Sequence, residues 1–266
     1  MNARLLSLIL LAAAAPCGCD RGDAPPAPAA APSLPETPGP SGFGLPPASG
    51  DARLRRAEDL RRETRYAEAA AEYRRVLEED GRHVGALAGL ATVALNMGDA
   101  ASAIPCASRA AELKPGDAGM HNLLGVALVS AGRRGDASKA FEKALEISPA
   151  DPMILLNASL CWADLGMWAR ADDGARRAAE GLPGVPTPHI LRGRFLVRQG
   201  RDAEAVPHFR EAVRLAPDMG TAHYHLGKAL LKAGRAEEGA EALRAALRTN
   251  PPPEIREEIR KLLAGR

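Results

Sequence analysis

Between residues 118 and 151, apolar and small residues follow a helical period in two successive stretches. The first stretch places residues at i, i+3, i+4 and i+7 on one face, namely His121, Leu124, Gly125 and Leu128. The second stretch forms another such face with Ala137, Phe141, Ala144 and Leu145. Gly132 separates the two and Pro149 follows the second, and both residue types are typical of helix ends. The pattern predicts two antiparallel helices joined by a short turn.

The same unit recurs along the chain at an interval of 34 residues. The closing proline returns as Pro115, Pro149, Pro183, Pro217 and Pro251. The separating glycine returns as Gly98, Gly132, Gly166, Gly200 and Gly234. A period of this length predicts an array in which each repeat contacts its neighbours, so the molecule offers a long surface without a central cavity.

The unit closely resembles the tetratricopeptide repeat, whose pattern consists of small and apolar residues at fixed places. In residues 118–151 these places hold Leu124, Gly125, Leu128, Ala137, Phe141, Ala144 and Pro149. The resemblance implies an all-α fold, an α-solenoid that winds as a right-handed superhelix. Six repeats are expected, at residues 50–83, 84–117, 118–151, 152–185, 186–219 and 220–253.

Both ends of the array are predicted to be covered. In the first repeat, Arg53 and Arg56 stand where other repeats carry buried residues, as expected for a terminal repeat with one face in solvent. After the sixth repeat, residues 254–266 carry an apolar stripe. Its members are Ile255, Ile259, Leu262 and Leu263. The stripe predicts an amphipathic helix that caps the last repeat.

The start of the chain, residues 1–19, resembles a bacterial lipoprotein signal. Arg4 precedes the apolar run Leu5–Ala15, which is too short to span a bilayer, and Cys17 and Cys19 follow. Cys19 comes after a glycine and is the predicted lipidation site, whereas Cys17 comes after a proline, which disfavours cleavage there. The alternative is ordinary secretion, with cleavage after one of the alanines.

Residues 20–49 are rich in proline and alanine and contain a single aromatic residue, so they are predicted to form a disordered linker. The signal and the linker together predict a lipoprotein of the bacterial cell envelope, anchored in a membrane by its N-terminal lipid and facing the periplasm. A soluble periplasmic protein is the alternative.

Composition and motifs argue against nucleic-acid binding and catalysis. The formal net charge is +2, which is too balanced for a nucleic-acid-binding chain. The sequence contains no phosphate-binding loop and no His-Glu-x-x-His motif. His223 and His225 are two residues apart and fall on different helix faces, and Cys106 and Cys161 lie in repeats separated by a whole unit. We therefore expect no enzyme activity, cofactor, metal, nucleic acid or small-molecule substrate.

The family resemblance implies that the first helices of successive repeats line a concave groove that binds a partner protein. The predicted groove residues are Thr92, Asn122, Val126, Met153, Leu156, Leu160, Ile190, Arg194, Tyr224 and Lys228. The middle of this set is apolar and its C-terminal end is basic. Such a surface suits an extended peptide or an amphipathic helix with hydrophobic anchors and an acidic end. The alternative is that neighbouring helices shield some of these residues.

One residue departs from the core pattern. Arg192 occupies the place that holds leucine in other repeats, such as Leu124 and Leu226. Because an unpaired buried charge is costly, we expect Arg192 either to pair with an acid, such as Glu180 or Asp202, or to extend toward the groove edge.

These observations favour a non-enzymatic scaffold tethered in the bacterial envelope, which binds a protein partner through its groove. In size and layout the chain resembles the lipoproteins with six such repeats that help assemble type IV pilus secretins. The alternatives are a regulatory subunit of an envelope enzyme and an unlipidated periplasmic adaptor.

Overall fold

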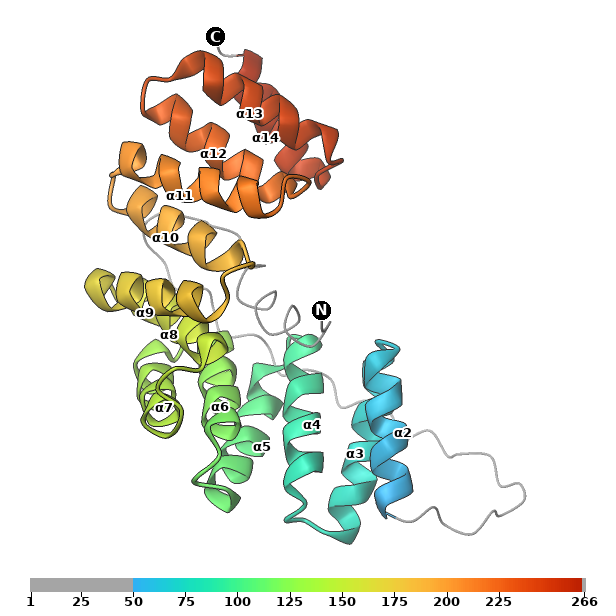
Figure 1. Cartoon of the computed structure of the whole chain (residues 1–266). Helices are drawn as coiled ribbons and strands as arrows, with labels where there is room; N and C mark the ends of the chain where they lie inside the picture. Colours follow the sequence, from blue (N-terminus) through green and yellow to red (C-terminus); the bar gives the residue numbers. More distant parts are fainter. Residues whose placement is uncertain (1–49, 265–266) are drawn as a thin grey trace.

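The computed structural model describes residues 50–264, and every regular element in this range is an α-helix (Figure 1). The thirteen helices of this range confirm the predicted all-α class. The predicted signal at residues 1–19, with Cys19, and the predicted linker at residues 20–49 lie outside the described residues.

Twelve of the helices form six consecutive pairs, one pair in each 34-residue unit. The pairs are α2 (Gly50–Arg62) with α3 (Tyr66–Glu79), α4 (Val84–Asn96) with α5 (Ala100–Leu113), α6 (Ala118–Ser130) with α7 (Arg134–Ile147), α8 (Pro152–Asp164) with α9 (Trp168–Gly181), α10 (Thr187–Arg198) with α11 (Asp202–Leu215), and α12 (Gly220–Lys232) with α13 (Ala236–Arg248). The last helix, α14 (Pro253–Ala264), follows the sixth pair. Figure 1 shows the pairs stacked in chain order along an arc, with the helix axes turning between α6 and α10.

The turn inside each pair depends on a residue in the left-handed backbone region. The five predicted glycines take φ values from +75° to +78°, as at Gly132 and Gly234. Glycine adopts this conformation without steric cost, so it ends the first helix and allows the chain to reverse. In the first repeat the equivalent residue is Thr64, which takes a φ of 61° despite its branched side chain.

Within several repeats the two helices approach closely where a glycine faces a large side chain. A Cβ atom on Gly125 would lie 2.5 Å from Cε1 of Phe141, and one on Gly193 would lie 2.6 Å from Cε1 of Phe209. Glycine is therefore required at these crossings by the packing of the opposite helix. In the second repeat the same places hold Ala91 and Ala107, both fully buried.

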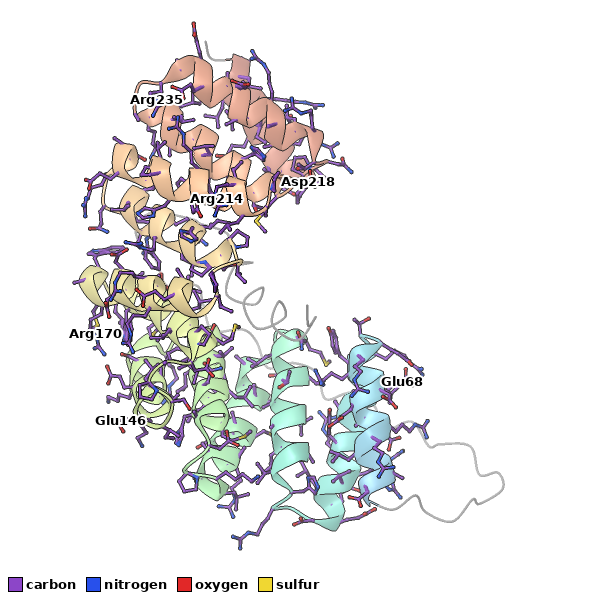
Figure 2. All side chains as sticks on the ribbon, in the orientation of Figure 1. Glu68, Glu146, Arg170, Arg214, Asp218 and Arg235 are labelled. Atoms are coloured by element: carbon purple, nitrogen blue, oxygen red, sulfur yellow. The ribbon has the colours of Figure 1, made fainter. Side chains whose placement is uncertain are left out.

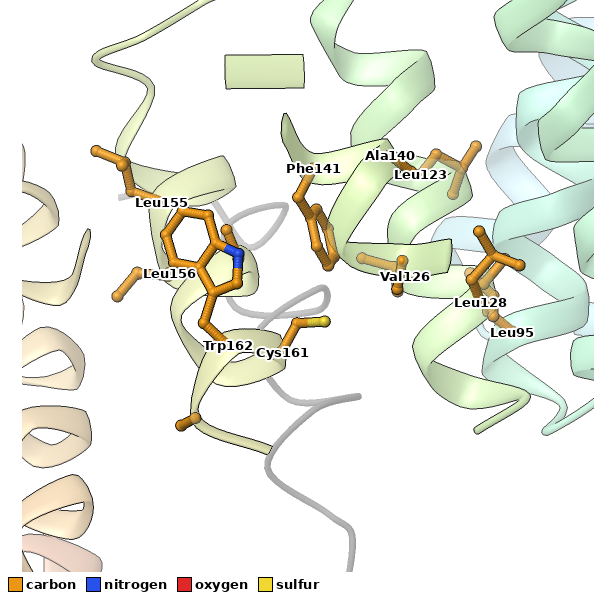
Figure 3. Close-up of a cluster of buried hydrophobic side chains, with 14 of the residues drawn as sticks. Leu95, Leu123, Val126, Leu128, Ala140, Phe141, Leu155, Leu156, Cys161 and Trp162 are labelled. Atoms are coloured by element: carbon orange, nitrogen blue, oxygen red, sulfur yellow. The ribbon is translucent and has the colours of Figure 1, made fainter. Parts of the chain in front are cut away.

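The apolar core continues from one repeat to the next. Its largest cluster runs from α4 to α10, and Figure 3 shows Leu123, Phe141 and Trp162 among its members. Trp162 also donates a hydrogen bond from Nε1 to Oγ of Ser138 on α7, at 3.1 Å. Contacts of this kind between neighbouring repeats hold the array together, because no repeat can bury its apolar faces alone.

Candidate functional site

The first helices of the repeats form one face of the array. Each of these helices contacts the first helix of the next repeat, from α2 with α4 to α10 with α12, whereas the second helices make no comparable contacts with one another. The first helices therefore lie on the more tightly curved side of the arc in Figure 1. This inner face is the candidate site, and all the predicted groove residues lie on its helices.

The structure divides the predicted groove residues into two groups. Thr92, Met153, Leu160, Ile190, Arg194 and Lys228 are half-buried, so part of each side chain is accessible. Asn122, Val126, Leu156 and Tyr224 are buried, with Leu156 at 0% exposure. As α8 contacts both α6 and α10, side chains between these helices are covered from two sides. The prediction that Leu156 is presented to a partner is therefore corrected, since it belongs to the core.

Two buried asparagine side chains, Asn122 and Asn157, form a hydrogen bond with each other. Nδ2 of Asn157 on α8 donates a hydrogen bond of 3.0 Å to Oδ1 of Asn122 on α6. Both side chains are buried, so the bond links two consecutive first helices beneath the inner face. Asn122 consequently has a structural partner within the array. The hydroxyl of Thr92 is also occupied, because it donates to the carbonyl of Ala88 at 2.8 Å.

Three cations at the basic C-terminal end of the groove are paired with carboxylates of the chain. Arg198 donates to Asp164 at 2.9 Å, and Nζ of Lys232 lies 3.7 Å from a carboxylate oxygen of Asp202. Lys228 is paired as well, with a carboxylate from α14. The sequence predicted that this end of the groove is basic, but it did not reveal that carboxylates of the same chain pair with these cations.

Lys228 lies at the centre of a small polar cluster. Its Nζ donates to Oε1 of Glu258 at 2.7 Å and to the hydroxyl of Tyr224 at 3.0 Å, and it lies 5.0 Å from the centre of the Tyr224 ring. Burial opposes the charge of Lys228, but the hydrogen bonds to Glu258 and Tyr224 outweigh it and raise the lysine pKa. The ion pair thus joins the groove to the capping helix.

His225 lies beside this cluster and is uncharged at neutral pH. Its ring stacks on Phe209 with the ring centres 5.5 Å apart. Burial, together with the positive charges of Arg194 and Lys228, lowers the pKa of His225 to about 3. His223 has a different partner, since its Nε2 donates to the carbonyl of Pro217 at 2.7 Å. The two histidines therefore serve packing and a backbone contact.

The partner of Arg192 is neither of the two acids predicted. Arg192 donates to both carboxylate oxygens of Asp172 on α9, at 2.7 Å from Nε and 3.3 Å from Nη2. The expectation of a structural ion pair with an acid is confirmed, but the acid is Asp172 and neither of the two named as examples. Arg192 thus joins repeats four and five at a place where three other repeats carry a leucine.

The outer face of the array is charged and carries shallow depressions. Figure 2 shows Glu146, Arg170 and Arg235 at the outer edge of the arc. Between α7 and α9 a broad, open depression of about 630 Å³ lies over Trp162, and the guanidinium of Arg170 covers the Trp162 ring at 4.4 Å. Its acids and bases are largely paired with each other, as in the 2.8 Å contact between Arg170 and Glu142. This depression has no converging polar groups of the kind that orient a small ligand.

Residues 50–264 offer no cluster of three or more histidine, cysteine or acidic side chains that could bind a metal ion. In the same part of the chain, no helix has the length and apolar character needed to cross a bilayer.

Stacked helix pairs with a continuous inner face define a helical-repeat protein. A family model of the tetratricopeptide repeat matches residues 54–118, 89–152, 122–186 and 190–253, so the chain belongs to the tetratricopeptide repeat family. Proteins of this family act as scaffolds that bind peptide or protein partners. A search of curated proteins finds no match to the sequence.

Several solved structures share the fold. PilW, a widely conserved type IV pilus biogenesis factor, is 19% identical and superposes with a TM-score of 0.73 over 80% of this chain and 98% of PilW. A thermophilic repeat protein of Thermus thermophilus is 23% identical, with a TM-score of 0.58 over 69% of this chain and all of its own (100%). YrrB, a repeat protein with an unusual peptide-binding site, is 20% identical, with a TM-score of 0.54 over 71% of this chain and 97% of YrrB.

Proposed function

We propose that this protein is a non-enzymatic scaffold of the bacterial envelope that binds a segment of a partner protein along its inner face. The observation that carries the proposal is the inner face itself. It runs through six first helices and presents half-buried apolar side chains in its middle, among them Met153, Leu160 and Ile190. Spaced apolar anchors on a curved helical surface suit an extended peptide or an amphipathic helix.

The proposed location depends on the N-terminal sequence. The lipoprotein-like signal with Cys19, followed by the proline-rich residues 20–49, would hold the array at a distance from a membrane. The fold similarity to PilW over nearly all of that chain supports an envelope assembly, such as a pilus secretin, as the setting in which the partner is found.

The groove is tested by placing a negative charge at two accessible apolar positions. The variant Met153→Glu, Leu160→Glu changes the middle of the inner face, and both side chains are half-buried, so the fold should persist. Met97→Glu is the matched control, because Met97 is 55% exposed and lies at the end of α4. Circular dichroism melts of the three proteins establish that each is folded.

The readout is an affinity pull-down from detergent-solubilised envelopes, with the captured proteins identified by mass spectrometry. We expect a partner that wild type and Met97→Glu retain and the double variant loses. If the double variant retains the same proteins as wild type, the inner face is not the binding surface. Identification of an envelope assembly component would support the proposed setting, whereas a catalytic partner would favour the regulatory-subunit alternative.

The anchor is tested separately. Cys19→Ser should move the protein from the membrane fraction to the soluble periplasm and abolish fatty-acid labelling, while Cys17→Ser should behave as wild type. Loss of labelling in Cys17→Ser instead would reassign the modified cysteine, and absence of labelling in wild type would favour the soluble adaptor.

A further inference from the structure

The capping helix α14 is attached to the array by a limited set of contacts. Ile259 is its single fully buried side chain, and it packs in a cluster with Tyr224, Leu243 and Ala246. The remaining apolar residues of α14 are only partly buried against this cluster; they are Ile255, Leu262 and Leu263. Elements with few buried contacts open more readily than the elements they cover.

The contact between α14 and the inner face also has a polar part. Glu258 accepts a hydrogen bond from Lys228, which is part of the predicted groove. The Lys228 side chain remains 37% exposed and the Glu258 side chain 45% exposed, so water can reach the pair. An ion pair of this exposure contributes little to stability, and another carboxylate can replace Glu258 at small cost.

The segment before α14 separates it from the repeats. Asn250 takes a φ of 54°, and the three prolines from 251 to 253 follow it. Because proline lacks a backbone N–H, these residues cannot continue the hydrogen bonds of α13 into α14. The helix is therefore a separate unit that follows a break in the helical backbone.

We propose that the C-terminal end of the array, formed by α12 and α13, is a docking site for an amphipathic helix of a partner protein. In this view α14 occupies the site within the chain and is replaced when the partner helix binds. The partner helix would carry an aliphatic residue at the place of Ile259, with a carboxylate immediately before it to pair with Lys228. The inference rests in part on the proposed function, because Lys228 also belongs to the groove.

The contacts that α14 makes define the chemistry of this occupant. The end surface offers an apolar cluster beside the ammonium group of Lys228. On one face of α14, Ile255, Ile259 and Leu262 pack against the cluster and Glu258 accepts a hydrogen bond from the ammonium group. A partner helix must compete with a tethered α14, whose effective concentration is in the millimolar range. Tethered α14 would therefore weaken binding of helices that match the site poorly.

The test uses a fluorescent peptide with the sequence of residues 251–266 as the probe, titrated against the full chain by anisotropy. In the variant Glu258→Gln, Ile259→Ala the internal helix is weakened, so we expect the peptide to bind at least tenfold more tightly than to wild type. Adding Lys228→Ala to that variant should reduce the affinity about fivefold or more. The exposed Glu257→Gln substitution is the matched control and should bind the peptide as wild type does.

Equal peptide binding by wild type and the weakened variant, or none by either, would overturn the proposal. Hydrogen exchange of the wild-type protein gives a second measurement that needs no variant. Amides of α14 should exchange at least tenfold faster than those of α13, and equal protection of the two helices would also overturn the proposal.

Two further outcomes distinguish this docking site from the groove and from self-association. Met153→Glu, Leu160→Glu should bind the peptide normally in the weakened background, so failure of the groove and failure of this site are distinguishable. A concentration-dependent dimer of wild type that requires Ile259, seen by light scattering, would show that a second copy of α14 is the occupant and would overturn the assignment to a partner helix.

Discussion

Arg192 on α10 and Asp172 on α9 form a two-bond ion pair across the junction of repeats four and five, with Nε of Arg192 2.7 Å from Oδ1 of Asp172. The arginine side chain is 21% exposed and the aspartate 45%. Since the equivalent place holds leucine in three other repeats, at Leu90, Leu124 and Leu226, this junction combines a polar contact with an otherwise apolar interface.

We expect Asp172→Ala to destabilise the array by about 1 kcal/mol, because it leaves a mostly buried guanidinium without its carboxylate. Arg192→Leu should fall within about 1 kcal/mol of wild type or be more stable, since an apolar residue of similar size can replace a buried ion. Urea unfolding of both variants and their combination measures the coupling. If Asp172→Ala lowers the free energy of unfolding by the same amount in the Arg192→Leu background as in wild type, the ion pair contributes nothing to stability.

Thr64 is strained where five repeats use glycine. Thr64→Gly should stabilise the first repeat by about 0.5 kcal/mol, because relief of the positive φ is partly offset by the greater freedom of glycine in the unfolded chain. The reverse change, Gly98→Thr, should destabilise by about 1–2 kcal/mol. A Cβ at Gly98 meets no atom within 4 Å, so the loss would not come from a clash at that atom. Thermal melts in which the two changes shift the midpoint in the same direction would contradict a role for backbone strain.

The close approach of α6 and α7 depends on Gly125. Gly125→Ala should cost about 1–3 kcal/mol, because the new methyl group overlaps the ring of Phe141 in a packed interior. Gly135→Ala is the control on the same pair of helices, since a Cβ there meets nothing within 4 Å. That control should stabilise by up to about 1 kcal/mol, as alanine is the better helix former. Equal effects of the two substitutions on the urea midpoint would exclude a steric cause.

The repeat frame could be predicted from sequence because its signals are local. Gly132 ends α6 through its own backbone conformation, and Pro149 follows Ser148, the residue that caps the C-terminus of α7. Both act on the residues beside them, so their spacing alone defined the helix pairs. The helix pairs could therefore be predicted without knowledge of any contact between repeats.

Contacts between repeats were harder to predict, because they depend on how one helix pair is rotated against the next. Asn122 and Asn157 are 35 residues apart, one more than the period, so they occupy different places in their repeats. Asp172 likewise reaches Arg192 from the preceding repeat, while the two acids chosen from sequence do not. Glu258 lies beyond the last repeat, where the 34-residue period no longer predicts which residues face each other. Its pairing with Lys228 was therefore not predicted.

His225 should make the array less stable as the pH falls below neutrality. Its folded-state pKa of about 3 lies below the ordinary value of 6.5, because the ring is buried near Arg194 and Lys228, with Glu258 opposing. Between these two values the unfolded chain binds a proton that the folded chain does not, so stability is lost as pH falls through 6.5 toward 3 and is unaffected above about pH 7.5. From pH 7.5 to 5.0 the loss from this residue would reach ~2 kcal/mol.

His225→Phe keeps an aromatic ring against Phe209 and removes the titrating group. The stability difference between wild type and this variant should be constant above pH 7.5 and should shift in favour of the variant as the pH falls to 5.0. His189 and His208 also have lowered pKa values, mainly through burial, and titrate equally in both proteins, so the difference isolates His225. Urea midpoints measured at half-unit pH intervals give the comparison. If the urea midpoints of the two proteins change with pH in parallel, protonation of His225 does not lower stability and the prediction is contradicted.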